Sequence, residues 1–164
     1  MALETIPGSV QTLENLLIIG TPDASDPLSV AALVAGTAKS LTYSFTPDGW
    51  DFPISQSTIE DKRLTAAQVG SLPGSTVYGP ISVTFVHGSA SDVAKTFLAP
   101  GTVVNLTIRD SLPNSTAPTA AQKADTVKVR CGVQVPVRSG DIQTTKQMLF
   151  VVAGSYVAAG TLVT

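Results

Sequence analysis

The chain has 164 residues, of which 43% are hydrophobic and only 13% are charged, and its formal net charge is -2 at pH 7. This length favours one domain, and the high apolar share excludes a disordered chain. The slightly acidic balance argues against a protein that grips nucleic-acid phosphates. Because few charges are available to cover the surface, we expect much of it to be buried between subunits.

No segment has the features of a secretion signal or of a membrane-spanning helix. The first residues lack a basic start followed by a continuous apolar stretch, and the most apolar segment, 148–163, is interrupted by Gly, Ser and Thr. Cys131 is the single cysteine, so an intramolecular disulfide is impossible and a core position is expected. We therefore expect no membrane insertion by this chain and no redox chemistry.

The beginning of the chain is predicted to form an N-terminal arm, residues 1–26, which precedes a single β domain, residues 27–164. At the junction Asp26 precedes Pro27. This pair is typical of a helix start, because the carboxylate accepts hydrogen bonds from the first amides and proline lacks an N–H that would have no partner. A short helix is predicted over residues 28–35, ending at the glycine that follows.

A hairpin is predicted next. Residues 41–45 alternate between apolar and hydroxylic side chains, which predicts a strand with one buried face. Residues 46–50 contain Pro, Asp and Gly and predict a turn. The chain would then return through residues 54–64 as the second strand of the hairpin.

The middle of the chain predicts a further strand and a second helix. Residues 72–80 carry two turn signals that combine Pro and Gly, and residues 81–85 alternate again, which predicts a strand. A short helix is predicted over residues 88–98, where Ser89 or Ser91 can cap the first turn.

The C-terminal part is predicted to be almost entirely β. Residues 104–109 alternate, and a loop rich in Pro, Ser, Thr and Ala follows over residues 110–123. The clearest strand covers residues 127–138, where every odd position up to 137 is apolar. Residues 146–152 predict its hairpin partner and residues 156–163 a last strand. The whole is mainly β, with one or two short α-helices.

Residues suited to catalysis or metal binding are scarce. His87 is the single histidine, and a triad with Ser91 and Asp92 can be drawn, but sequence neighbours seldom have triad geometry. Asp48 and Asp51 lack the spacing of a calcium loop, and one His with one Cys cannot close a zinc site. A small hydrolase using His87 stays as an alternative hypothesis, but we predict no catalytic residue, no metal and no cofactor.

Three basic residues, Lys128, Arg130 and Arg138, fall on one face of the long strand predicted above. We interpret them as a solvated strand face, or as partners of acids such as Glu60 and Asp61 on a neighbouring subunit. A DNA-binding face is disfavoured, because the chain as a whole is slightly acidic.

Three stretches of the chain carry a family resemblance, namely residues 27–37, 41–50 (Leu-Thr-Tyr-Ser-Phe-Thr-Pro-Asp-Gly-Trp) and 56–64. They resemble the opening of the major tail proteins, or tail tube proteins, of long-tailed bacteriophages. Residues 127–135, with Cys-Gly-Val-Gln in their middle, and residues 146–150 are similar in placement. None of these strings is an active-site signature, so the resemblance implies a structural protein and not an enzyme.

The resemblance implies a β-sandwich- or barrel-like subunit with a flanking helix, six copies of which form a ring whose inner strands join into one continuous barrel. The rings would stack into the tube of the virion tail, assembled in the bacterial host cytoplasm. Double-stranded DNA would pass through without tight binding during genome ejection. Tail terminator, tape measure and baseplate-proximal proteins are the partners that the resemblance adds to the homo-oligomer.

The resemblance also implies where rings meet. The ring-stacking hairpin tip is expected at residues 46–57, with Asp48, Trp50, Asp51 and Phe52 as its contacts and Trp50 as the exposed apolar anchor. In this family channel linings tend to be acidic or neutral. Lys128 and Arg130 are therefore expected to contact a neighbouring subunit or the tube exterior.

A second function class stays open, namely a capsid-decorating or adhesin-like β-sandwich whose loop at residues 110–123 recognises a partner. Negative-stain microscopy separates the two hypotheses. A tail tube subunit forms rings or hollow filaments, whereas a binding module stays as discrete monomers or small oligomers.

Overall fold

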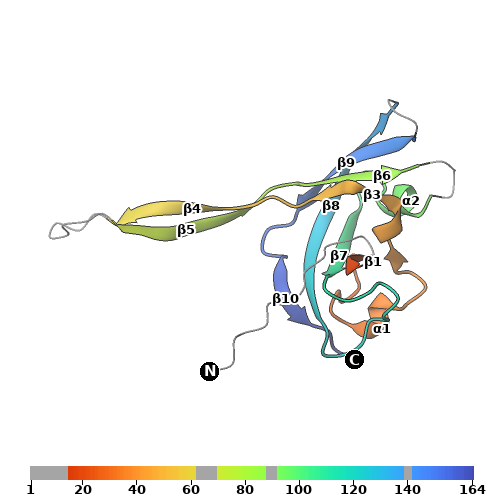
Figure 1. The fold of residues 1–164 in the computed structure, drawn as a ribbon, viewed down its shortest axis with the longest axis horizontal. Helices are drawn as coiled ribbons and strands as arrows, with labels where there is room; N and C mark the ends of the chain where they lie inside the picture. Colours follow the sequence, from red (N-terminus) through yellow and green to blue (C-terminus); the bar gives the residue numbers. More distant parts are fainter. Residues whose placement is uncertain (1–14, 62–69, 88–91, 139–141) are drawn as a thin grey trace, which may run out of the picture.

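A computed structural model describes residues 15–61, 70–87, 92–138 and 142–164. Its backbone forms one large antiparallel sheet and a separate two-stranded hairpin that stands away from it (Figure 1). The elements are β1 (Leu17–Pro22), α1 (Val30–Leu33), β2 (Lys39–Ser40), the 3-10 helix η2 (Thr42–Ser44), β3 (Phe45–Asp51), β4 (Ile54–Asp61), β5 (Gly70–Tyr78), β6 (Ile81–Val86), α2 (Val93–Phe97), β7 (Val103–Arg109), β8 (Lys123–Val137), β9 (Thr144–Val151) and β10 (Val157–Thr161). The prediction of a mainly β fold with two short helices is confirmed.

The large sheet is built around the 15-residue strand β8. Its strand order is β2-β1-β7-β8-β9-β6-β3, and β10 pairs with the first part of β8. The path ends at β2 and at β3, so the sheet is not a closed barrel within the residues that the structure describes. The hairpin β4–β5 pairs only with itself.

The main core lies on one face of this sheet. Ile18 on β1 and Phe45 on β3, from strands near or at the two ends of the path, belong to the same buried cluster. A backbone bond of 2.8 Å from the Leu41 N–H to the Ile18 carbonyl extends the pairing of β1 with β2, and the chain then passes through η2 into β3. Buried Ala94 of α2 and Leu98, which follows it, add to the cluster. The sheet therefore curls around its core, with α2 against it.

A second, smaller cluster lies on the other side of β1 and β8. It is formed by Leu17, Ile19, Leu33, Ala124 and Leu162, which brings α1 and the end of the chain onto this part of the sheet.

Side chains of β7 hold the segment before α1 in place. The Asn105 amide donates to the carbonyls of Pro22, Asp23 and Ser25 at 2.9–3.2 Å. The Thr107 hydroxyl donates to the Pro27 carbonyl at 2.8 Å. The outer face of the sheet is thus covered over β7 and the start of β8.

The predicted N-terminal arm is wrong for residues 17–22. They form β1, which lies between β2 and β7 in the large sheet. Leu16 and Ile18 point into the main core while Leu17 and Ile19 point into the second cluster. A strand that is buried on both faces shows no alternation, which is why the pattern was missed. Residues 1–14 lie outside the described residues.

Two local predictions nearby need correction. Helix α1 covers only Val30–Leu33 with Ser29 as its N-cap, and the Asp26 carboxylate instead accepts a bond from the Leu28 N–H at 3.0 Å. The strand predicted at 41–45 is mostly the 3-10 helix η2. There the Thr42 hydroxyl accepts a bond from the Ile18 N–H at 2.8 Å, in place of a strand partner.

The turn predicted at residues 46–50 is wrong, because these residues belong to β3. Their Pro and Gly form an irregularity in the pairing with β6, between the pairs Phe45–Phe85 and Trp50–Val83. Gly49 lies so close to β6 that a Cβ atom would collide with the Thr84 carbonyl. The glycine therefore serves a bulge-like close approach. The same explanation holds for residues 72–75, which belong to β5 beside a register shift.

The remaining strand predictions are confirmed in placement: β6 and β7 contain the predicted segments, β8 and β9 each end one residue before the predicted end, and β10 covers only 157–161 of the predicted 156–163. Helix α2 lies within the predicted second helix, with Asp92 at its N-cap. The proposed caps Ser89 and Ser91 lie outside the described residues.

Candidate assembly surfaces

The hairpin β4–β5 is the most exposed part of the described chain. It extends as a two-stranded arm from the end of the large sheet (Figure 1). Ile59 and Leu72 pair directly near its far end and are 57% and 49% exposed. Because an isolated two-stranded hairpin is marginally stable in water, these side chains form a candidate contact surface.

Trp50 and Phe52 lie at the base of this hairpin, not at its tip. Trp50 packs against the main core, with its ring centroid 5.8 Å from that of Phe45. Phe52 also packs on the core. The predicted tip at residues 46–57 is therefore misplaced, because the chain reverses only after Asp61. Asp48 and Asp51 are exposed on β3 and lie far from the hairpin end.

Strands β3, β6, β9 and β8 form a four-stranded segment with two free edges among the described residues. β3 is the last strand of the sheet on one side. On the other side, β7 begins at Val103 opposite Arg130, and the 101–102 turn bonds only as far as Cys131. Residues 133–137 of β8 therefore have a strand partner, β9, on one side only.

The outer face of this segment is apolar at its centre. Its most exposed apolar residues are Val133 (75%), Val135 (56%), Met148 (54%) and Phe150 (51%). Met148 and Phe150 are exposed by the regular alternation of β9. Val133 and Val135 are exposed because a bulge in β8 between Cys131 and Gln134 turns odd positions from the core side to the outer side. The apolar odd positions from 127 to 137 therefore do not share one buried face beyond Cys131.

Two glutamines fill the core side beyond the bulge. The Gln147 amide donates to the Leu98 and Gly132 carbonyls at 2.8 Å, and the Gln134 amide donates to the Leu98 and Lys95 carbonyls at 3.0 and 2.9 Å. They cap the carbonyl end of α2, where the last carbonyls of a helix have no partner within the helix itself. Hydrogen bonds from the two glutamines therefore connect the bulged part of β8 and its partner β9 to the end of α2.

The three basic residues noted in the sequence, Lys128, Arg130 and Arg138, do not share one environment. The Lys128 ammonium lies 2.7 Å from the Asp23 carboxylate of the same chain. Arg130 is exposed, and so is Arg138, just after β8. Glu60 and Asp61 lie at the far end of β4, so a contact between these acids and the basic residues of a neighbouring subunit stays a prediction.

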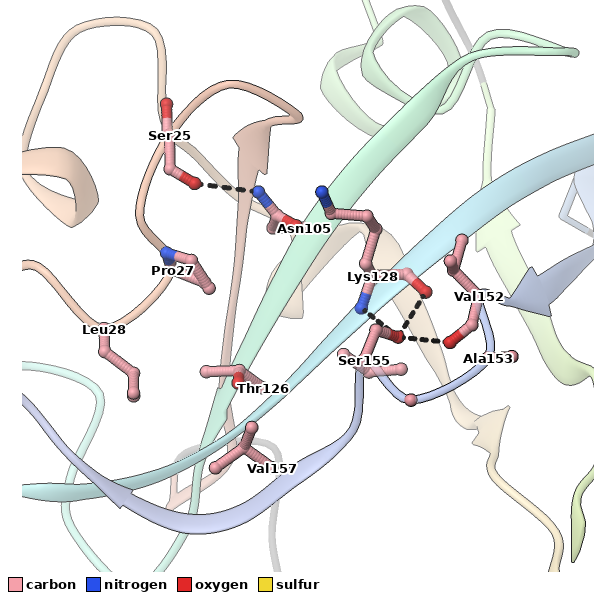
Figure 2. Close-up of a pocket in the computed structure, with 12 residues that line it drawn as sticks. Ser25, Pro27, Leu28, Asn105, Thr126, Lys128, Val152, Ala153, Ser155 and Val157 are labelled. Atoms are coloured by element: carbon pink, nitrogen blue, oxygen red, sulfur yellow. Dashed lines mark hydrogen bonds between the residues drawn. The ribbon is translucent and has the colours of Figure 1, made fainter.

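A pocket of about 390 Å³ lies between the segment at 25–28, the strands β7 and β8, and the connection after β9 (Figure 2). Several of its polar groups already bond to the protein. The Ser155 hydroxyl donates to the Val152 carbonyl at 2.6 Å, lies 3.1 Å from the Lys128 carbonyl and accepts from the Lys128 N–H, and the Asn105 amide donates to the Ser25 carbonyl. These bonds tie the connection to β8 and leave few groups for a ligand.

Of the residues considered for catalysis, the structure describes His87 and Asp92. The Nδ1 atom of His87 lies 3.2 Å from the Thr145 hydroxyl. Asp92 occupies the N-cap position of α2 without a side-chain cap bond, and Ser91 lies outside the described residues. In the described ranges there is no group of three or more His, Cys, Asp or Glu residues that could hold a metal ion. None of the described helices is long and apolar enough to span a membrane.

A family model described as phage tail tube protein matches residues 5–160. The chain belongs to the phage tail tube protein family. This confirms the resemblance noted in the sequence and makes the chain a structural component of the virion tail that assembles into a multi-subunit tube. The family points to a structural protein and not to an enzyme. No curated protein matches the chain.

Proposed function

We propose that this chain is the repeating subunit of the tail tube, that its copies form closed hexameric rings, and that the stacked rings form the channel for genome delivery. The observation that carries this proposal is the pair of free edges on opposite sides of the segment β3-β6-β9-β8. Free strand edges are templates for pairing with another chain.

Ring closure follows from which edges pair. The β3 edge of one copy meets the edge formed by residues 133–137 of the next copy. The two edges differ, so each contact is head-to-tail, and such contacts close into a ring when the rotation between copies permits. Closure leaves neither of these two edges free, which removes the aggregation hazard that they pose in the single subunit.

The curvature of the ring decides which face lines the channel. The core face of the segment carries α2 and the other strands of the body, and six such bodies fit only on the outside. The outer face, with Val133, Val135, Met148 and Phe150, then faces the channel.

The face proposed to line the channel also carries charged side chains. Arg130 pairs with Phe150, and Lys146 pairs with Val135, so both cations lie on the same face as the apolar residues. Asp51, opposite Ser82 on β6, supplies an acid at the β3 edge. Arg130 is therefore proposed to face the channel, unlike in the sequence-based expectation. Because DNA affinity rises with the number of phosphates that cations neutralise, Arg130 and Lys146 alone agree with DNA passage without tight binding.

Hairpin β4–β5 is proposed to contact the next ring. A strand of eight residues spans about 26 Å at about 3.3 Å per residue. The Ile59–Leu72 pair near its end provides the apolar contact. The tail terminator, tape measure and baseplate-proximal proteins would meet the tube at its ends or inside it.

Microscopy and cross-linking test the proposal. Negative-stain images of the purified protein are expected to show rings or hollow filaments, and discrete monomers would instead favour a capsid-decorating or adhesin-like module. Oxidation of the double variant Asp51→Cys, Val135→Cys is expected to give a ladder of covalent oligomers that ends at the number of copies per ring. The two single variants are the controls and should give no ladder. Rings that form without cross-links at these edges would contradict the edge pairing.

A further inference from the structure

The backbone ladder is interrupted where hairpin β4–β5 joins the body. β3 ends at Asp51 and β5 ends at Tyr78, and the two residues that follow each of them belong to no strand. Pro53 and Pro80 lie in these gaps and have no N–H to donate. One backbone bond of 2.9 Å, from the Gly79 N–H to the Pro53 carbonyl, spans the joint. A single bond leaves the direction of the hairpin weakly fixed by the backbone.

Three aromatic rings fill this joint. Phe52 and Tyr78 belong to the hairpin base, and Tyr156 belongs to the connection between β9 and β10. The centroid of Tyr156 lies 5.4 Å from that of Phe52, in an edge-to-face arrangement, and 5.2 Å from that of Tyr78. Such separations are within the favourable range for aromatic pairs. Tyr156 thus touches both sides of the hairpin base from a different part of the body.

Tyr156 is itself fixed to the long central strand. Its hydroxyl donates to one carboxylate oxygen of Asp125 on β8 at 3.0 Å. The other oxygen of Asp125 accepts a bond of 2.7 Å from the Ala159 N–H. Burial, followed by the bond and charge of Asp125, raises the pKa of Tyr156 to about 12, so the hydroxyl stays protonated and donating. Contacts therefore run without a gap from the hairpin base to β8.

We propose that Tyr156 is the positioning residue that sets the direction of hairpin β4–β5 relative to the body. A rotation of about 10° at the joint moves the end of a strand about 26 Å long by about 4–5 Å. That displacement equals the whole distance over which apolar side chains count as in contact. That such a displacement would break the contact with the next ring rests on the proposed function. The direction of the hairpin within one subunit does not depend on it.

Distances between two spin labels within one subunit test the proposal. The labels are placed at Thr58→Cys on β4 and at Asp110→Cys just after β7, and labelled chains are mixed with an excess of unlabelled chains. Native Cys131 can stay, because its thiol is buried and burial raises its pKa, which slows labelling. The distance distribution is expected to be narrow in the parent protein and clearly broader or shifted in Tyr156→Leu.

Two further variants separate positioning from packing. Tyr156→Phe keeps the ring contacts and loses the bond to Asp125, so it should give an intermediate width. Tyr43→Leu removes an exposed tyrosine of η2 and should leave the distribution unchanged. An unchanged distribution in Tyr156→Leu overturns the proposal, even if the melting temperature falls. A broader distribution in a protein that forms no rings would leave this proposal standing and refute only the proposed function.

Discussion

The bulge in β8 can be tested by one added methyl group, through Gly132→Ala. A Cβ atom at this position would lie 2.6 Å from the backbone carbonyl of Met148 and 3.0 Å from the ring of Phe150. Overpacking of this kind costs about 1–3 kcal/mol, and the restriction of the unfolded chain returns about 0.4–1 kcal/mol. The net loss should lower the melting temperature by several degrees, since about 1 kcal/mol corresponds to 2–4 °C at this size.

A matched glycine provides the control. At Gly36 no heavy atom lies within 4 Å of the place that a Cβ atom would take, and φ is not positive, so Gly36→Ala should be neutral or slightly stabilising. Both variants are unfolded at one protein concentration, because assembly shifts apparent stability. Equal melting temperatures for Gly132→Ala and the parent would show that β8 and β9 accommodate the methyl group, and the close approach would then not fix the bulge.

Three other changes have defined outcomes. Trp50→Ala should destabilise the subunit by about 2–4 kcal/mol in urea unfolding, because the ring packs on the core; a folded subunit with only weaker ring stacking would instead support the sequence-based placement at a tip. Ile59→Asp and Leu72→Asp should leave subunit stability within about 0.5 kcal/mol but shorten the tubes seen by microscopy, and unchanged tube length would remove the Ile59–Leu72 pair from the stacking contact. Because the pKa of Tyr156 is raised to about 12, the folded state holds this proton above pH 10 while the unfolded state releases it. Its stabilising contribution is therefore complete below about pH 10 and lost between about pH 10 and 12, which unfolding at several pH values can follow in the parent and in Tyr156→Phe.

The sequence predicted those strands that have one buried face and one polar face. Residues 81–85 and 104–109 are of this kind, and both are strands. β1 was missed because both of its faces are buried. Turns were predicted within β3 and β5, where the chain in fact continues as a strand. The reason is that Pro and Gly occur both at bulges and at turns. Local sequence cannot tell a bulge from a turn, because a bulge is defined by how the residues pair with the partner strand.

The candidate assembly surfaces were less accessible to sequence reasoning. Which part of the β8 edge stays free depends on where β7 begins relative to β8. This register between the two strands cannot be read from the local sequence of either strand. The bulge at Gly132 could have been suspected from a glycine within an alternating run. The basic residues were identified, but the partner of Lys128 is Asp23, an acid more than one hundred residues away that no local pattern connects to it.

The distribution of exposed apolar residues favours assembly over solubility alone. Single exposed apolar side chains are normal on any protein surface, whereas contiguous ones mark contact sites. In this chain the sheet is covered over β7 and the start of β8 by the segment before α1, and it is bare over the end of β8 and over β9, where Val133 and Phe150 lie. The bare part coincides with the part of β8 that lacks a β7 partner. Since the exposed face and the unpaired edge occur on the same strands, the edge pairing proposed above would gather the exposed faces of neighbouring copies on the inner side of the ring.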